Sequence, residues 1–212
     1  MKVLIACEYS GRVRNAFARR GHTAVSVDLL SSDSEGWHYR GNVLTFLKEY
    51  PQWDLMIAFP PCTHLSGVGA GTWKEKERTG QQEEAMHFFL DLWEQKQISR
   101  IAIENPQGKM STWWRKPDQY IDPWQFGDPW FKRTGLWLKG LPLLQPSKPV
   151  TPLGHWVDGG TMMYRGLSKP LHEGSYMLTK AKGITTTNPK AIAHERAKTF
   201  KGVARAMANQ WG

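Results

Sequence analysis

The sequence predicts an α/β protein in which a mostly parallel sheet carries helices on both faces. Short apolar runs recur along the first half of the chain, and segments with apolar residues at helical spacing lie between them. Alternation of this kind favours a parallel sheet, because each helix returns the chain to the start of the next strand. With 212 residues, 40% of them hydrophobic, the chain is long enough for one sizeable core.

The first strand, helix and second strand are the clearest elements. Lys2–Cys7 is a continuous apolar run, which is typical of a buried strand. A turn leads to Gly11, and apolar residues at helical spacing then predict a helix over Arg12–Arg20. Thr23–Val27 predicts the second strand, which Asp28 closes.

The next segments lead to a third strand. Ser31–Gly36 is polar and predicts a loop, whereas Val43–Tyr50 predicts a short helix. Asp54–Phe59 is apolar again and predicts a strand that runs directly into Pro60-Pro61-Cys62. Glycines interleaved with charged residues over Thr63–Thr79 predict a mobile loop.

The remaining elements are less regular. Gln81–Lys96 predicts an amphipathic helix, and Ser99–Ile103 predicts the next strand. The stretch that follows is rich in proline, tryptophan and glycine and has little periodicity, apart from a strand predicted at Thr134–Lys139. Ala191–Gln210 predicts a closing helix.

Composition narrows the class of protein. The net charge of +9 favours a polyanionic partner such as a nucleic acid, although a cationic enzyme without one is the simpler alternative. The tryptophans between residues 113 and 137 favour a packed framework over base stacking. Two cysteines are too few for a disulfide framework, and no apolar stretch is long enough to cross a bilayer. We therefore expect a reduced, cytoplasmic setting without membrane association.

Two predicted strands lead into residues with reactive side chains. Cys62 follows two prolines, which hold the backbone rigid, and Glu104-Asn105 follows Ile103. Ligands bind at the carboxyl ends of strands in α/β proteins, so the thiol and the carboxyl are predicted to face one cleft as a nucleophile and its proton partner. A buried cysteine and a strand-ending turn at Asn105 are the structural alternatives.

The order of these residues resembles the DNA cytosine-5 methyltransferases. Pro61-Cys62, Glu104-Asn105 and the arginine of Lys132-Arg133-Thr134 are similar to three motifs of that family. Leu4–Gly11 resembles its first motif and Phe200–Met207 its last, and the pattern is closest to small phage-encoded members. The resemblance implies a Rossmann-like S-adenosylmethionine-dependent methyltransferase fold and a role in DNA methylation, as in restriction-modification.

The resemblance also implies catalytic roles. Cys62 would add to carbon 6 of cytosine, Glu104 would bind ring nitrogen 3, and Arg133 would bind carbonyl oxygen 2 or a phosphate. S-adenosylmethionine would be the cofactor and single- or double-stranded DNA the partner, and in a duplex the target base would be flipped out of the stack. The residues implied in cofactor binding are Ala6, Glu8, Gly11, Asp28, Leu29, Asn42, Val43 and Pro60, and those implied in substrate binding are Pro61, Asn105, Lys132, Lys74 and Arg78.

The chain also departs from the family pattern. The first motif keeps only Gly11, Asn42 stands where an acid is usual, and Pro106 follows Glu104-Asn105. Residues 1–144 would form the catalytic core and 191–212 the returning helix, so that 145–190 leave little room for a target-recognition domain. Three alternatives follow: the enzyme modifies DNA with low sequence specificity, it needs a protein partner for target recognition, or it acts on a smaller substrate such as single strands or nucleotides. The phosphate contacts in that insertion would be His155, Arg165, Lys169, Lys180 and Lys182.

Two other functions compete with cytosine-5 methylation. An amino-group DNA methyltransferase would have an aromatic residue at the position of Cys62. A degenerate member of the family, acting as a nucleic-acid-binding or accessory subunit, would fit the altered first motif. No metal is expected, because Cys7, Cys62, His64 and His87 lack the paired spacing of a zinc site.

Overall fold

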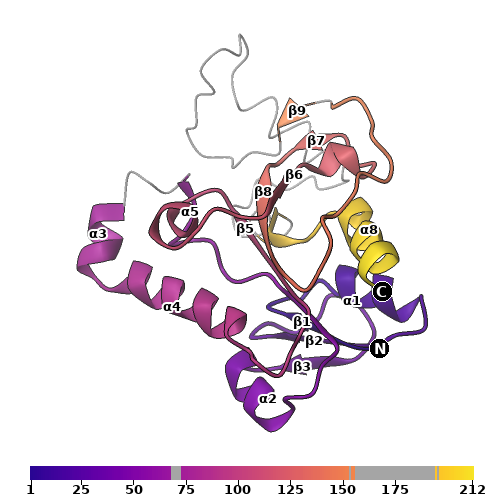
Figure 1. Cartoon of the computed structure of the whole chain (residues 1–212), viewed down its shortest axis with the longest axis horizontal. Coiled ribbons are helices and arrows are strands. Elements are labelled where there is room, and N and C mark those ends of the chain that lie inside the picture. The colour runs from indigo at the N-terminus through magenta and orange to yellow at the C-terminus, as the bar shows by residue number, and fades with distance from the viewer. Residues whose placement is uncertain (68–72, 153, 156–193, 195) are drawn as a thin grey trace.

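The computed structural model describes residues 1–67, 73–152, 154–155, 194 and 196–212 (Figure 1). The elements alternate between strand and helix over the first half, as the sequence predicts. The strands are β1 Lys2–Ala6, β2 Thr23–Asp28, β3 His38–Arg40, β4 Leu55–Ala58, β5 Ile101–Pro106, β6 Gln119–Ile121, β7 Trp130–Phe131, β8 Thr134–Lys139 and β9 Gly154–His155. The helices are α1 Arg12–Ala18, α2 Val43–Glu49, α3 Trp73–Arg78, α4 Gln81–Trp93, α5 Lys109–Trp113, the 3₁₀ turn η2 Pro123–Gln125, and α8 Lys201–Trp211.

The main sheet has seven strands in the order β3-β2-β1-β4-β5-β8-β6. The first five are parallel, and β8 is antiparallel to both β5 and β6. The expected Rossmann-like α/β class with a mostly parallel sheet is therefore confirmed. A separate pair, β7 and β9, lies beside η2 at the top of Figure 1.

Helices cover both faces of the sheet because successive strand residues point in opposite directions. Val3 and Ile5 pack with α1 and α8, whereas Leu4 and Ala6 pack with α2 and α4. All four strand residues are fully buried. Figure 1 shows α1 and α8 together on one side and α2 and α4 on the other.

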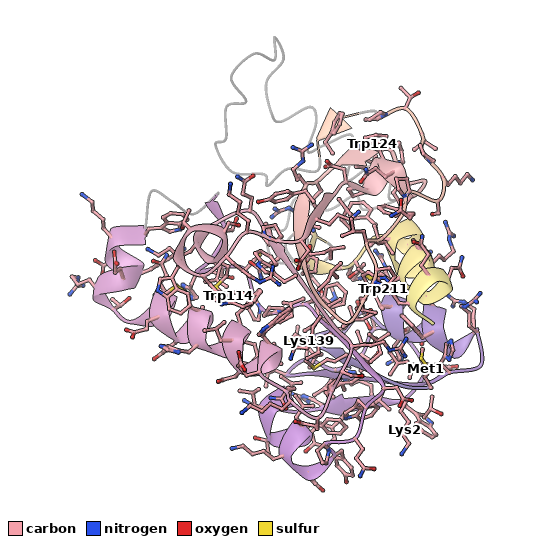
Figure 2. The ribbon with its side chains drawn as sticks, in the orientation of Figure 1. Met1, Lys2, Trp114, Trp124, Lys139 and Trp211 are labelled. Carbon is pink, nitrogen blue, oxygen red and sulfur yellow. The ribbon has the colours of Figure 1, made fainter. Side chains whose placement is uncertain are left out.

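The tryptophans mostly serve as the packed framework that the composition favours. Trp211 and Trp137 are buried on opposite faces, and Figure 2 shows Trp211 beside α1. Trp114 packs edge-on against Trp93, and the Arg115 guanidinium carbon lies 4.9 Å from the centre of the Trp114 ring. An exception is Trp113, which is 43% exposed.

Several sequence predictions need correction. The predicted closing helix is interrupted: residues 194, 196 and 197 are helical, residues 198–200 are not, and the final helix begins at Lys201, where Asp128 accepts a hydrogen bond from the Gly202 amide at 2.8 Å. The predicted mobile loop contains α3, and the weakly periodic stretch contains α5, β6 and β7. The edge strand β3 was not predicted, because three partly exposed residues carry little hydrophobic signal.

The proposed insertion is described only in part. Residues 145–152 and the short strand β9 are described, whereas Arg165, Lys169, Lys180 and Lys182 lie outside the described residues. His155 is placed by its backbone pairing with Phe131 alone. Within the described ranges, the helices are too short or too polar to cross a membrane.

Candidate active site at the carboxyl edge of the sheet

The ends of four neighbouring strands bring the predicted residues to one edge of the sheet. β2, β1, β4 and β5 are adjacent and parallel, so their carboxyl ends lie together. Asp28 ends β2, Cys62 follows β4, and Glu104 lies within β5 rather than after it. We call Pro60–Gly67 with Glu104 and Asn105 the thiol half of this edge, and Cys7–Gly11 with Asp28–Leu30 the turn half.

Hydrogen bonds hold the loop that carries Cys62. The Cys62 carbonyl accepts from the amides of Leu65 and Ser66 at 3.0 and 2.8 Å, which closes a tight turn. The buried Asn105 side chain donates to the Pro60 carbonyl at 3.0 Å. Asn105 therefore ties the two prolines to the neighbouring strand and fixes where the thiol emerges.

The far end of the same loop is clamped against the segment after β5. The Gly67 amide donates to the Gln107 carbonyl at 3.0 Å, and the Lys109 amide donates to the Leu65 carbonyl at 2.8 Å. This close approach requires glycine at position 108, where a Cβ atom would lie 1.9 Å from the Leu65 carbonyl oxygen.

Side chains from α3 and α4 bind the loop from outside. Lys76 donates to the Thr63 carbonyl at 2.7 Å, and Gln82 donates to the His64 carbonyl at 3.2 Å. The described part of Thr63–Thr79 thus contains a helix and side-chain hydrogen bonds to the Cys62 loop, whereas residues 68–72 lie outside the described residues.

The two cations predicted to contact substrate from this region both lie on α3. Lys74 is exposed there. Arg78 donates two hydrogen bonds to the Glu75 carboxylate at 2.6 and 3.0 Å, on the solvent-facing surface. Arg78 would have to exchange Glu75 for a phosphate in order to bind substrate.

Charges of both signs surround the Cys62 thiol. Pro61 and Cys62 are exposed at the end of their loop. Partial desolvation raises the pKa of the Cys62 thiol and the negative charge of Glu104 raises it further, whereas Lys132 and Arg196 act to lower it. The thiol therefore becomes more acidic when the charge of Glu104 is neutralised.

Glu104 is held as a proton-binding group. Burial raises the pKa of its carboxyl, and the opposing influences are the charge of Lys132 and a hydrogen bond from the Thr134 hydroxyl. Burial likewise lowers the pKa of Lys132, while Glu104 and Cys62 act to raise it. A carboxyl with a raised pKa retains or takes up a proton more easily than one in water.

The structure brings Lys132, rather than Arg133, to this pair. The Arg133 side chain is 67% exposed and its Nε atom lies 3.2 Å from the Asp122 carboxylate. Thr134, two residues after Lys132, bonds Glu104. Lys132 also acts on the charge of Glu104, so Lys132 and Thr134 both face Glu104, whereas Arg133 faces Asp122.

In the turn half, Glu8 organises the backbone. Its buried carboxylate accepts from the Val13 amide at 2.7 Å, the Arg14 amide at 3.2 Å and the Ser10 hydroxyl at 3.0 Å. Gly11 adopts a φ of 66°, a left-handed conformation that favours glycine. Since the Glu8 oxygens accept these bonds, the surface that the turn offers to a ligand is mainly backbone.

A buried arginine holds the next loop against this turn. Arg14 is fully buried and donates to the hydroxyls of Ser26 and Ser32 at 3.0 and 3.1 Å and to the carbonyls of Ser34 and Glu35 at 2.9 and 2.7 Å. Sequence reasoning placed Arg14 on a helix without any special role. Its partners lie up to 21 residues away, so no local pattern could reveal them.

The end of β2 exposes an acid and two leucines. Asp28 accepts from the Leu30 amide at 2.9 Å, and burial raises the pKa of its carboxyl. Leu29 is 69% exposed and Leu30 is 51% exposed. An acceptor beside an uncovered apolar surface fits a ligand that carries both hydroxyl groups and a flat apolar ring.

The other residues assigned to the cofactor play structural parts. Ala6 and Val43 are buried in the core. The Asn42 side chain accepts from the amides of Leu44 and Thr45, at 2.8 and 3.2 Å, and so caps α2. Pro60 is buried between β4 and the Cys62 turn.

The segment before α8 crosses the turn half and was not predicted as part of the site. The Tyr9 hydroxyl donates to the His194 carbonyl, and Arg12 donates to the Thr199 carbonyl at 2.9 Å. Asp33 binds the side chains of His194 and Lys198 at 2.9 and 2.8 Å.

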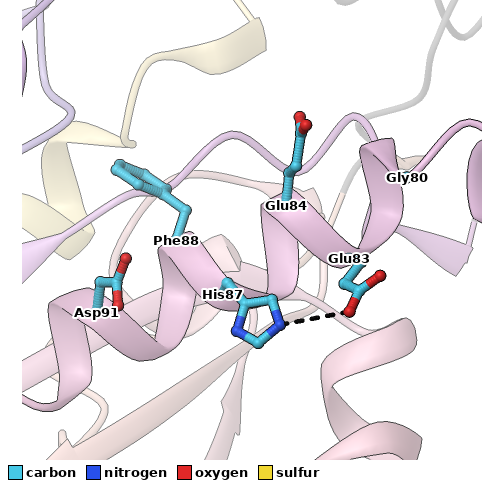
Figure 3. A pocket seen from close by; sticks show the side chains of 6 residues that line it. All are labelled: Gly80, Glu83, Glu84, His87, Phe88 and Asp91. Atoms are coloured by element: carbon cyan, nitrogen blue, oxygen red, sulfur yellow. Dashed lines mark ion pairs between the residues drawn. The ribbon is translucent and has the colours of Figure 1, made fainter.

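A depression of about 460 Å³ lies on the surface of α4, away from these residues (Figure 3). Half of its lining residues are acidic, namely Glu83, Glu84 and Asp91, and His87 lies 3.6 Å from Glu83. It has no side chain in common with the thiol half or the turn half. Among the described residues, no group of three or more histidine, cysteine or acidic side chains could hold a metal ion.

Comparisons with known proteins add similarities of fold. No family model matches the chain, and no curated protein matches it. Among solved structures, an E. coli prophage protein assigned as a DNA modification methyltransferase is 18% identical with a TM-score of 0.46, over 71% of this chain and 53% of that one.

Two eukaryotic structures are similar to the same degree. The Entamoeba histolytica methyltransferase EhMeth is 14% identical with a TM-score of 0.47, over 71% of this chain and 57% of its own. A Spodoptera frugiperda DNMT2 variant is 15% identical with a TM-score of 0.44, over 85% and 65%. The chain thus spans between about half and two thirds of the length of these proteins.

Proposed function

We propose that the chain is an S-adenosylmethionine-dependent methyltransferase that acts on carbon 5 of cytosine in DNA through a transient bond to Cys62. The observation that carries the proposal is an exposed cysteine in the loop after β4 and a proton-binding carboxyl on the adjacent parallel strand β5, with Lys132 acting on both groups. The net charge of +9 supports a polyanionic substrate.

The turn half supports the choice of cofactor. Asp28 offers acceptor oxygens for ribose hydroxyls, and the exposed Leu29 offers an apolar surface for adenine. The backbone of the turn from Cys7 to Gly11 would hold the amino-acid part. S-adenosylmethionine, when bound, supplies an electrophilic methyl group.

Cys62 and Glu104 would act on the base together. The Cys62 thiolate forms a bond to carbon 6 while Glu104 gives a proton to ring nitrogen 3, so that carbon 5 becomes nucleophilic and accepts the methyl group. A base then removes the proton from carbon 5. The bond between carbon 6 and sulfur breaks, and Glu104 recovers its proton from nitrogen 3.

The charges of the thiol half suit this sequence of events. The negative charge of Glu104 raises the pKa of the Cys62 thiol, and a protonated Glu104 no longer has that effect. Engagement of the base by neutral Glu104 would therefore favour the Cys62 thiolate at the moment when the base is in place.

Transfer of a labelled methyl group to unmodified DNA, in single- and double-stranded form, tests the proposal. We expect 5-methylcytosine among the product nucleosides with the wild type, and none above background with Cys62→Ala, because the covalent step is lost. S-adenosylmethionine binding by Cys62→Ala, measured by calorimetry, controls for folding. Methyl transfer that survives in Cys62→Ala, or a methylated amino group, would refute the mechanism.

A non-catalytic role as an accessory or nucleic-acid-binding subunit gives a different outcome. The wild type would then bind DNA in a mobility-shift assay and transfer no methyl group. This alternative is motivated by the small number of residues, 145–190, that the chain has in place of a target-recognition domain.

A further inference from the structure

We propose that Lys132 is the cation that acts on Cys62 and Glu104, in the position that sequence reasoning gives to Arg133, and that the backbone of Arg196 holds it there. The inference rests on the proposed function for its catalytic meaning. The contacts of Lys132 do not depend on the proposed function, since they are made in the protein without cofactor or DNA.

The direction of the chain before β8 is the first argument. Thr134 opens β8 and its hydroxyl bonds the Glu104 carboxylate on β5. Lys132 is separated from Thr134 by one residue and acts on the same carboxyl. Arg133 points the other way and bonds Asp122.

The second argument is how Lys132 is anchored. Its Nζ atom donates to the Arg196 carbonyl at 2.9 Å and lies 5.8 Å from the centre of the Phe200 ring. Phe200 is 5% exposed and precedes α8, so the anchor belongs to the folded core. One of three ammonium hydrogens is used by this carbonyl, which leaves the charge available to neighbouring groups.

The third argument is the set of charges that face Cys62. They are Glu104 on β5, Lys132 before β8 and Arg196 before α8. Lys132 acts on the thiol and on the carboxyl alike, and both of them act on Lys132. Arg133 is not among these charges, and its guanidinium lies beside Asp122 instead. Lys132 would therefore favour the thiolate and restrain the proton affinity of Glu104.

Alkylation of Cys62 by iodoacetamide across a pH series tests the inference without cofactor or DNA. Peptide mass spectrometry separates Cys62 from Cys7, whose burial raises its thiol pKa to about 12. In Lys132→Met we expect the thiol pKa to rise and alkylation at pH 7.5 to slow. A tenfold loss of thiolate is partly offset by the greater nucleophilicity of the more basic thiolate, so the rate should fall about three- to fourfold.

Arg133→Met is the matched control, because it removes the neighbouring charge in the same way. We expect its alkylation rate to match the wild type and Lys132→Arg to retain most of the wild-type rate. An equal loss in Arg133→Met would overturn the inference. Failure of methyl transfer alone would leave these rates unchanged, so the two proposals fail separately.

Lys132→Met leaves Glu104 buried without its cation, which can unfold the protein or favour the neutral form of Glu104, and a neutral Glu104 no longer raises the thiol pKa. A second comparison avoids this difficulty, since Glu104→Gln and the double variant Glu104→Gln with Lys132→Met bury no carboxylate. Glu104→Gln should alkylate faster than the wild type, and the double variant about three- to fourfold more slowly than Glu104→Gln. Equal rates in these two variants would also overturn the inference.

Discussion

The two halves of the carboxyl edge differ in how completely the protein itself fills them. In the thiol half, backbone and side-chain hydrogen bonds hold the Cys62 loop at both ends. In the turn half, the backbone is equally fixed, but Leu29 and Leu30 lie open to solvent beside Asp28. The nucleophile is thus preorganised, whereas the turn half has an apolar surface for a ligand to cover.

The largest effect should follow the loss of the acid in the turn half. Asp28→Ala removes the acceptor proposed for the ribose hydroxyls, and a hydrogen bond to a charged group contributes about 1.5–3 kcal/mol. We expect S-adenosylmethionine affinity to fall about 10- to 150-fold in calorimetry. Asp54→Ala, at the opposite edge of the sheet, is the control. Equal affinity of Asp28→Ala and the wild type for S-adenosylmethionine would contradict the proposal that the turn half binds the cofactor.

A somewhat smaller effect, on stability, should follow a change in the thiol half. Gly108→Ala places a Cβ atom against the Leu65 carbonyl, and overpacking of this kind costs about 1–3 kcal/mol of unfolding free energy. Hydrogen exchange should then increase over residues 62–67, whereas cofactor affinity should stay within twofold.

Gly21→Ala serves as the control for that substitution. No atom lies within 4 Å of its Cβ position, although φ is +82°. We expect a cost of about 1–2 kcal/mol from backbone strain alone, with no change at residues 62–67. If hydrogen exchange over residues 62–67 in Gly108→Ala matched the wild type, the contacts between this loop and the segment after β5 would not fix the position of Cys62.

The smallest effect concerns the segment that crosses the turn half. Burial alone would raise the pKa of Asp33, but hydrogen bonds from Lys198 and His194 outweigh it and lower the pKa. These contacts therefore stabilise the fold above the ordinary carboxyl pKa, and the contribution is lost as the pH falls through the lowered value.

Asp33→Asn should cost about 0.5–1 kcal/mol at pH 7, because the carboxylate is partly exposed. Denaturant unfolding at pH 7 and at pH 3 measures the difference, which should shrink at the lower pH. The exposed Asp91→Asn is the control. If the loss of unfolding free energy in Asp33→Asn were the same at both pH values, the ion pairs of Asp33 with His194 and Lys198 would not stabilise this segment.

Local patterns were sufficient for the framework and for the thiol. The strand before Cys62 and the strand Thr134–Lys139 were predicted because buried strands read as continuous apolar runs. The positions of Cys62 and Glu104 at one edge followed from parallel strand order. Short exposed elements such as α3 and β3 have too few buried residues to produce such a pattern.

The polar contacts of the site could not be predicted in the same way. Whether Lys132 or Arg133 faces Glu104 depends on where β8 begins, and a shift of one residue exchanges them. The contact between Tyr9 and His194 spans 185 positions, and the role of Gly108 depends on a loop more than forty residues earlier. Such contacts exist only in the folded chain.

The most direct test of the account is the intact mass of the protein after incubation with S-adenosylmethionine and DNA containing 5-fluorocytosine. The fluorine at carbon 5 prevents the final proton removal, so the bond to the enzyme persists. We predict a covalent complex whose peptide map places the adduct on Cys62, and no complex with Cys62→Ala. Methyl transfer to ordinary cytosine without such an adduct, or an adduct on Cys7, would contradict the account.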